Sequence, residues 1–320
     1  MRRFLKKVVT FFLVISIVTL SVNYIYMKLD KSDSSDVNKF ADIPSDIKVC
    51  NFGSSHGLYG FNYEDVKDVE CFNFGLSAQY LSYDKRLFEE YKDNIDGGAV
   101  VFLPVSYFSL FGKSELTEDV FEEKNRRYYR ILPPELIKEY DWETDIYMNY
   151  LPSLTADTKL FRVLLGRPVD DGSGVWFKTV WEIDVAEDAK GAYERHIVTD
   201  KFDENGKRIV NEEEVDALVY LIEACKEKGA TPILITTPFL KEYTDAVSGN
   251  DEEFYSEFYG LVNEIVEQTG VDYYDYAFDE RFVKNYDWFM NSDHLNKEGA
   301  RQFVNILMSE VVSRVTLQEE

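Results

Sequence analysis

The hydrophobic pattern of the chain begins with an uninterrupted apolar run. Residues 8–27 (VVTFFLVISIVTLSVNYIYM) carry no charge, and about 20 such residues in a helix cross the hydrocarbon core of a bilayer. Bulky aromatic residues close the run instead of a small-residue cleavage site, so we expect an uncleaved anchor rather than a signal peptide. The basic stretch MRRFLKK precedes the run. Positive charge on the N-terminal side of the run predicts a single-pass protein of the cell membrane with a cytoplasmic N-terminus and an extracytoplasmic C-terminal part.

The pattern of polar and apolar residues changes after the run, and it divides the chain into three parts. Residues 29–46 are polar and lack a helical period, which is typical of a linker. We therefore interpret 1–28 as the cytoplasmic N-terminus and transmembrane anchor, 29–46 as the linker, and 47–320 as one globular domain.

Strand-like and helix-like segments alternate within the globular part, and this alternation predicts an α/β fold with a parallel sheet covered by helices. Ser77 is expected to cap the first long helix. Asn211 and Glu214 have the spacing of a capping box at the start of a later one. The expected strands are 47–52, 69–75, 97–108, 231–238 and 271–276, and the expected helices are 78–95, a segment starting after 211, 251–268 and a segment from 297 to about 311.

The alternation lapses between about residues 109 and 210. Paired prolines, aromatic runs and the polar stretch PVDDGSG give no steady period there. We interpret 109–210 as an insertion over one face or rim of the domain.

Composition narrows the function classes. With 45% hydrophobic and 15% aromatic residues among 320, the chain has enough apolar material for a sizeable core. Its net charge of −24 argues against a nucleic-acid partner, because phosphate binding needs clustered positive charge. The three cysteines, Cys50, Cys71 and Cys225, are too few and too scattered for a disulfide framework or a zinc site. We expect neither a metal nor a cofactor.

Candidate chemistry lies directly after the first expected strand, in NFGSSHG (51–57). In an open parallel sheet, catalytic groups gather at the carboxyl ends of the strands, and a glycine followed by serine there can turn the chain and present a hydroxyl. A serine nucleophile needs a histidine base. Among the chain's three histidines, His56 is too near the serines in sequence and His196 lies in the insertion. His294 precedes the last helix at the same rim and is the better base, although Asp293-His294 can also be read as a plain polar loop before a helix cap.

These two blocks together resemble the SGNH (GDSL-like) hydrolase superfamily. The resemblance implies a flavodoxin-like three-layer α/β/α fold, with Ser55 rather than Ser54 as nucleophile and His294 as base. It places Gly75, in FNFGLSAQ, at the glycine whose N–H stabilises the oxyanion together with that of Ser55. The Gly-Ser-Ser variant is similar to that of the membrane-anchored D-alanyl-transfer proteins of the teichoic-acid system. The resemblance covers the order of elements over about residues 47–315 and leaves the insertion unexplained.

Two positions depart from the pattern of that superfamily. Asn291 stands three residues before His294, where the family has the orienting aspartate, so either this amide or a carboxylate such as Asp293 orients the base. No Gly-x-Asn-Asp block is present, and Ser106 in PVSYFS occupies the corresponding strand end as the candidate side-chain oxyanion donor.

The expected function is that of an extracytoplasmic serine esterase or acyltransferase. Its substrates would be O-acyl groups, acetyl or D-alanyl, on cell-envelope glycopolymers, with a membrane-bound acyl-donor protein as a further partner. Trp176 and Trp181 could stack on sugar rings or simply pack. The alternative hypotheses are a catalytically weakened domain that binds envelope polymer or a membrane acyltransferase, and an anchored scaffold.

Overall fold

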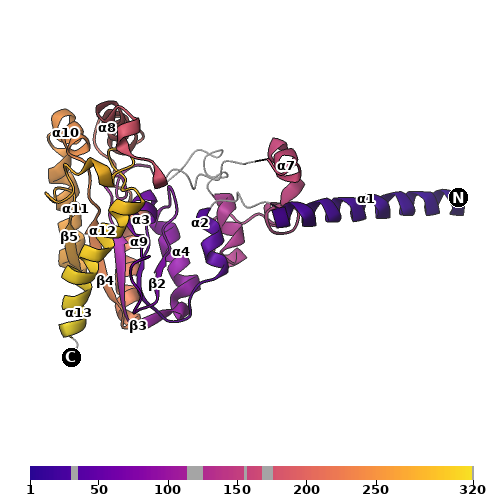
Figure 1. Cartoon of the computed structure of the whole chain (residues 1–320), viewed down its shortest axis with the longest axis horizontal. Coiled ribbons are helices and arrows are strands. Elements are labelled where there is room, and N and C mark those ends of the chain that lie inside the picture. The colour runs from indigo at the N-terminus through magenta and orange to yellow at the C-terminus, as the bar shows by residue number, and fades with distance from the viewer. Residues whose placement is uncertain (30–34, 114–124, 155–156, 168–175, 319–320) are drawn as a thin grey trace. The chain divides into compact units, whose positions relative to one another are not determined.

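The computed structural model describes residues 1–29, 35–113, 125–154, 157–167 and 176–318, and it divides into two compact units (Figure 1). Unit 1 consists of Met1–Ala41 and Glu118–Gly174, and unit 2 consists of Asp42–Thr117 and Val175–Glu320. The predicted insertion is thus shared between the units: its middle part groups with the N-terminal segment, and its ends group with the sheet.

Unit 2 is built on a five-stranded, fully parallel sheet, which confirms the predicted α/β fold. The strand order β2-β1-β3-β4-β5 is that of flavodoxin-like sheets. The order reverses direction at β1 and β3, and crevices outside the strand ends at such a point are where ligands bind. The strands are β1 Ile47–Asn51, β2 Cys71–Asn73, β3 Ile95–Pro104, β4 Thr231–Thr236 and β5 Asp272–Asp275.

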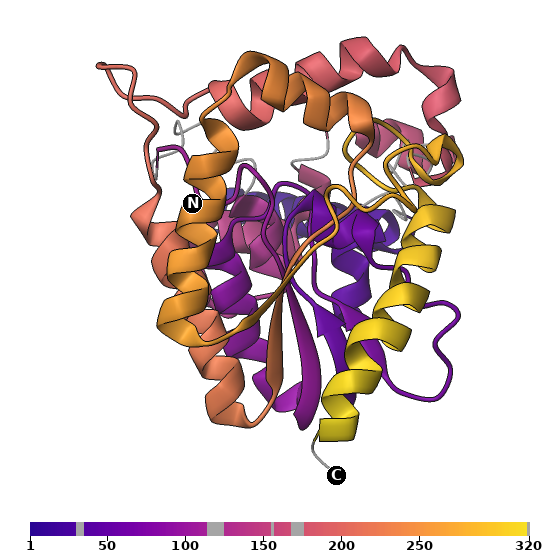
Figure 2. The ribbon, with the colours of Figure 1, turned by 90° about the vertical axis from the view of Figure 1, so that its left-hand side faces the viewer.

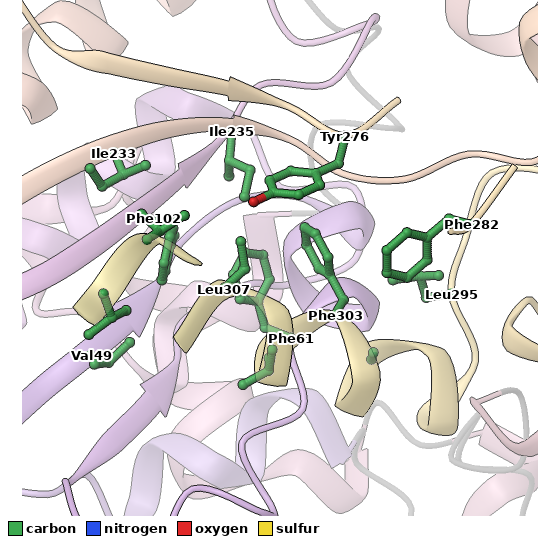
Figure 3. Packing of buried hydrophobic residues seen from close by; sticks show 14 of the residues in the cluster. Val49, Phe61, Phe102, Ile233, Ile235, Tyr276, Phe282, Leu295, Phe303 and Leu307 are labelled. Carbon is green, nitrogen blue, oxygen red and sulfur yellow. The ribbon is translucent and has the colours of Figure 1, made fainter. Parts of the chain in front are cut away.

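Helices cover both faces of this sheet. On one face, the apolar side of α12 (Lys297–Leu307) packs against the sheet. Figure 3 shows Phe303 and Leu307 of this helix beside Phe61, Phe102 and Ile235. Figure 2 shows the yellow α12 on one side of the sheet and the orange and salmon helices α11 and α9 on the other. The helices of unit 2 are α3 Ser55–Gly60, α4 Leu81–Tyr91, α8 Val185–Tyr193, α9 Glu212–Lys228, α10 Lys241–Asn250, α11 Phe254–Thr269, α12 Lys297–Leu307 and α13 Ser313–Gln318.

Helix capping differs in part from the prediction. The Asn211 side chain caps α9 as expected, accepting from the Glu214 N–H. The Glu214 carboxylate does not reach back to close a capping box. It accepts from the N–H groups of Leu81 and Ser82 and so caps α4, which begins at Leu81 and not after Ser77. The prediction that Ser77 caps this helix is therefore wrong, because a carboxylate from a distant helix satisfies the first-turn donors.

Unit 1 begins with α1, Arg2–Leu29, the one helix among the described residues that is long and apolar enough to cross a membrane. α1 packs on η6 and α7 within its own unit. The remaining elements of unit 1 are α2 Ser35–Asn38, η1 Lys39–Ala41, η3 Arg126–Arg130, η4 Pro134–Leu136, α6 Trp142–Asp145, η5 Ile146–Tyr150, η6 Pro152–Leu154 and α7 Asp157–Leu164.

Candidate active site

The tripeptide Asn-Phe-Gly occurs twice, at residues 51–53 and 73–75, and both copies end neighbouring strands. Asn51 and Asn73 are partners in the β1–β2 register, and the Asn51 Nδ2 donates to Asn73 Oδ1 at 3.0 Å. The rings of Phe52 and Phe74 stack with centroids 4.7 Å apart and planes at 5°. Sequence analysis missed this repeat, although the repeated tripeptide is a readable signal for two equivalent strand ends.

The two asparagines hold α3 in place. The Asn73 Nδ2 donates to the carbonyls of Gly57, Leu58 and Phe61, and so satisfies acceptors at the C-terminal end of this short helix. The approach of helix and strand is very close: a Cβ on Gly75 would lie 2.6 Å from the Leu58 nitrogen. A side chain at position 75 would therefore push α3 away from β2.

Gly53 makes the turn that presents Ser55. Its φ of +108° is a conformation that side-chain-bearing residues rarely adopt, and its N–H donates to the buried Asp84 carboxylate at 3.0 Å. The Gly53 carbonyl accepts from Leu76 at 3.1 Å, so the turn is held on both sides. Ser54 is the N-cap residue, and Ser55 is the first residue of α3.

Ser55 and His294 meet at the carboxyl end of the sheet. Ser55 Oγ lies 2.8 Å from His294 Nε2, although the two residues are 239 positions apart. His294 Nδ1 lies 3.1 Å from Asn291 Oδ1, which also accepts from the His294 backbone N–H at 2.8 Å. An Nδ1–H that donates to this oxygen leaves Nε2 free to accept the serine proton.

Asp293 lies at the centre of the chain's three histidines. Its side chain is fully buried; Oδ1 lies 3.2 Å from His294 Nδ1, and Oδ2 lies 3.3 Å from His56 Nε2 and 3.6 Å from His196 Nδ1. The Oδ1 contact fits an ion pair by distance but has no well-aligned hydrogen bond among the described residues. The Nδ1 proton is thus aligned with Asn291, and the carboxylate acts on His294 through its charge.

Burial and charge set the ionisation of this cluster. Burial alone would raise the pKa of Asp293, but the neighbouring His294 and His56 hold that pKa well below its usual range. Burial lowers the pKa of His56 to about 4 and that of His196 to about 3. The site therefore combines an anionic Asp293 with two neutral histidines at pH 7.

The other predicted site residues have different partners. The Ser106 hydroxyl lies 2.7 Å from His56 Nδ1. Because the His56 Nε2–H donates to Asp293, Nδ1 is the acceptor and the Ser106 hydroxyl donates its proton to it. The Gly75 N–H donates to Asn73 Oδ1 at 2.8 Å. In this structure, neither Ser106 nor Gly75 presents a free donor to Ser55, so their oxyanion roles stay predictions.

Sequence reasoning missed two further groups at the site. His196 lies in the π-helical turn Glu194–Val198 after α8, and this turn brings it to within reach of Asp293. Asp188, in α8, accepts from the Ser292 N–H at 2.9 Å and from its hydroxyl at 2.6 Å. The described part of the predicted insertion therefore contributes both to the histidine cluster and to the loop that carries the base.

A pocket of about 360 Å³ adjoins the site within unit 2. The Tyr59 ring connects the two, with its centroid 5.8 Å from that of His294 and 6.3 Å from that of Trp176. The pocket is lined by aromatic, charged, amide and hydroxyl side chains: Asn62, Glu64, Trp176, Phe177, Thr179, Asp287, Asn296, Lys297, Glu298 and Arg301.

His56, Asp293 and His294 are also the residues that could hold a metal ion, since their ligand atoms all lie within 4.8 Å of one another. In the tautomers that fit these hydrogen bonds, the lone pair of His56 is on Nδ1 and faces the Ser106 hydroxyl, and that of His294 is on Nε2 and faces the Ser55 hydroxyl. A metal ion would have to displace both hydrogen bonds. The donor set fits proton transfer better than metal binding.

The buried His56 and the largely buried His196 predict acid destabilisation. Their folded-state pKa values of about 4 and about 3 lie below the ordinary 6.5, so the unfolded chain binds more protons in this window. Their contribution to the free energy of unfolding is present above pH 6.5 and is lost as pH falls towards 4, by up to about 1.4 kcal/mol per pH unit for each histidine. Urea denaturation at pH 7 and pH 5 measures this loss. His196→Gln should reduce the pH dependence, and an unchanged dependence would contradict the assignment of His196 as a neutral group at pH 7.

Comparison with known proteins adds little to this geometry. The chain matches no protein-family model and no curated protein. A solved structure from Streptococcus pneumonia, described as a platelet activating factor, aligns with 92% of this chain and 97% of its own length, at 10% identity and a TM-score of 0.39. A protein from Bacteroides fragilis NCTC 9343, described as an acylhydrolase, aligns with 89% of this chain and 99% of its own length, at 11% identity and a TM-score of 0.40. At these identities and TM-scores, neither structure assigns a function to this chain.

Proposed function

We propose that unit 2 is a serine esterase or O-acyltransferase, which moves an acyl group from an ester through a covalent ester of Ser55. The observation that supports this most is the 2.8 Å contact between Ser55 Oγ and His294 Nε2, with the anionic Asp293 behind the imidazole. A hydroxyl, a base in hydrogen-bond reach and a group that orients the base are the parts of a nucleophilic serine site.

In the first half of the reaction, His294 Nε2 takes the Ser55 proton as Oγ bonds to the ester carbonyl carbon. The tetrahedral intermediate collapses when the bond to the leaving alcohol breaks, and that alcohol takes the proton back from His294. In the second half, His294 takes a proton from water or from an acceptor hydroxyl. This oxygen attacks the acyl-serine, and the proton returns to Ser55 Oγ.

Asn291 and Asp293 together take the role that a single orienting acid has in a serine triad: one orients His294 and the other supplies the negative charge. The Asn291 carbonyl oxygen accepts from His294 Nδ1–H at 3.1 Å and fixes the tautomer and ring orientation. Asp293, with its low pKa, places a negative charge 3.2 Å from Nδ1. This charge stabilises the imidazolium that forms when Ser55 is deprotonated, which an amide alone cannot do.

The start of α3 supplies the oxyanion donor. The first N–H groups of a helix have no acceptor within it, and Ser55 is the first residue of α3. We expect the Ser55 N–H, next to the nucleophile, to donate to the oxyanion of the intermediate.

The substrate we propose is an O-acylated glycopolymer of the cell envelope. Trp176 and Phe177 offer aromatic surface for sugar rings in the adjoining pocket. Lys297 and Arg301 also line it, as ion pairs with Glu64 and Glu298, and these charged groups suit the hydroxyls of a sugar. α1, inserted as an anchor, would keep unit 2 at the membrane where such polymers are assembled. Water as acceptor makes the protein an esterase, and a polymer hydroxyl makes it a transferase.

The test is active-site labelling of the full-length protein in detergent micelles with a fluorophosphonate probe, which phosphonylates activated serines. Wild type is expected to be labelled, Ser55→Ala to remain unlabelled, and Ser54→Ala to be labelled like wild type. Ser54 is the matched control, since it is the buried serine next to Ser55 and its side chain makes no capping hydrogen bond to α3. Absence of labelling in wild type, together with no hydrolysis of an activated acetyl ester, would leave a binding role and remove the catalytic one.

A further inference from the structure

Two helical segments of unit 1 expose apolar faces beside α1. In the first, α6 and η5 run together from Trp142 to Tyr150, and the exposed apolar side chains fall at positions i, i+4, i+5 and i+8, on one face of the helix. They are Trp142 (61% exposed), Ile146 (38%), Tyr147 (42%) and Tyr150 (67%).

The second exposed apolar segment follows directly. Leu154 ends η6, and α7 and the residue after it expose Phe161, Leu164 and Leu165, with Phe161 and Leu165 each about two-thirds exposed. Arg162 and Arg167 are exposed beside them. We call the eight apolar side chains of both segments the apolar platform: Trp142, Ile146, Tyr147, Tyr150, Leu154, Phe161, Leu164 and Leu165.

The hydrogen bonds of Asn23 fix the position of the platform along α1. Its side chain is buried; Nδ2 donates to the Tyr150 carbonyl, and Oδ1 accepts from the Ser153 N–H at 3.1 Å. An amide within an apolar helix needs such partners, because lipid offers none. Figure 1 shows α7 at this same, C-terminal end of α1.

The length of the helix places that end at the membrane boundary. With a rise of about 1.5 Å per residue, the uncharged run that starts at Val8 reaches roughly 22 Å at Asn23, whereas the hydrocarbon core is about 30 Å thick. Asn23 then lies on the order of 7 Å inside the far boundary. This matches the depth of roughly 5–10 Å to which interfacial amphipathic helices bury their apolar face.

We infer that the apolar platform is a lipid-binding surface, which lies in the boundary between headgroups and acyl chains of the leaflet where α1 ends. The inference rests on α1 being in a membrane and does not depend on the catalytic proposal. Trp142, Tyr147 and Tyr150 suit the headgroup level, where aromatic side chains with a polar end gather. Arg162 and Arg167 supply donors for lipid phosphates.

Lipid fits this surface better than a partner protein because the platform belongs to the segments that pack at the end of α1. Leu20, Tyr24 and Ile25 are exposed apolar side chains of α1 near Asn23. The lipid that surrounds α1 at this level is therefore within reach of the platform.

The experiment uses the full-length chain, with Cys71 replaced by serine, in vesicles of phosphatidylcholine and phosphatidylglycerol. Cys50 and Cys225 are buried. Single cysteines introduced as Phe161→Cys and Leu165→Cys carry an environment-sensitive NBD label. Part of the phosphatidylcholine carries a doxyl quencher, near the headgroup in one vesicle preparation and near the middle of the acyl chain in a second. Labels at 161 and 165 are expected to lose most of their fluorescence to the doxyl lipid and to resist iodide in the water phase.

Two control positions separate the possible results. Ile15→Cys, within the apolar run, reports whether α1 is inserted, and Glu135→Cys, an exposed position in η4 of the same unit, reports a water-facing label. If position 15 is quenched by the doxyl lipid while 161 and 165 respond to iodide like 135, the platform does not bind lipid, and a protein partner or a second copy covers it instead. If position 15 is not quenched either, the anchor itself is refuted and the inference falls with it.

Discussion

Replacement of Asp293 by asparagine is expected to lower kcat for ester hydrolysis by about 10²–10⁴-fold, with the fold intact. The substitution keeps the shape of the side chain but removes the negative charge 3.2 Å from His294 Nδ1. Without that charge, the imidazolium formed during attack by Ser55 loses its counter-ion, and removal of the charged orienting group in serine triads costs up to about 10⁴-fold. Steady-state kinetics with an activated acetyl ester measures the effect, and thermal unfolding checks the fold.

Asn291 provides the matched control for this change. Asn291→Asp places a carboxylate at the 3.1 Å contact with Nδ1 and should keep or raise the rate, whereas Asn291→Ala should cost less than Asp293→Asn. A wild-type rate in Asp293→Asn, with a large loss in Asn291→Ala, would assign the orienting role to the amide alone.

Gly57→Ala is expected to have the largest effect on stability. A Cβ at this position would lie 2.2 Å from the Phe52 carbonyl oxygen, which is backbone and cannot rotate away. α3 must shift to make room, and overpacking of this kind costs about 3 kcal/mol in the free energy of unfolding. Because Ser55 opens the same helix, fluorophosphonate labelling should fall as well.

Gly260→Ala is the control for this prediction. Gly260 lies in α11, and a Cβ there would meet nothing within 4 Å. An alanine should therefore stabilise the helix by up to about 1 kcal/mol. Urea denaturation of the full-length protein measures both variants. Equal stability of Gly57→Ala and wild type would show that α3 does not pack on the Phe52 carbonyl as described.

The fold was predictable where the pattern is local. The apolar segments IKVCN, AVVFLP and TPILIT lie on three adjacent strands, and the segments between them have helical periods, so the parallel sheet followed from the alternation. α10, Lys241–Asn250, was not predicted, because its short polar sequence gives a weak period and its buried side chains, Tyr243, Thr244 and Val247, are few. The cap of α4 could not be read from its neighbours, since Glu214 comes from a helix 133 positions away.

The candidate site was predictable only in its serine and its base. Ser55 and His294 each follow a recognisable element, the first strand and the start of the last helix, and the structure brings them together. His56 and His196 were set aside as bases, and neither contacts the Ser55 hydroxyl. The place of His196 beside Asp293 depends on the path of residues 185–198, a tertiary feature that no local period encodes.

The hydrogen bonds of Asn23 can form only after a distant part of the chain has been synthesised. Their acceptor on Tyr150 is made 127 residues after Asn23 itself. At about 5–20 residues per second, this corresponds to a delay of roughly 6–25 seconds. During that time the Asn23 amide lacks its native hydrogen-bond partners. An insertase or another temporary neighbour that satisfies this amide would act within this window, before Tyr150 and Ser153 are synthesised.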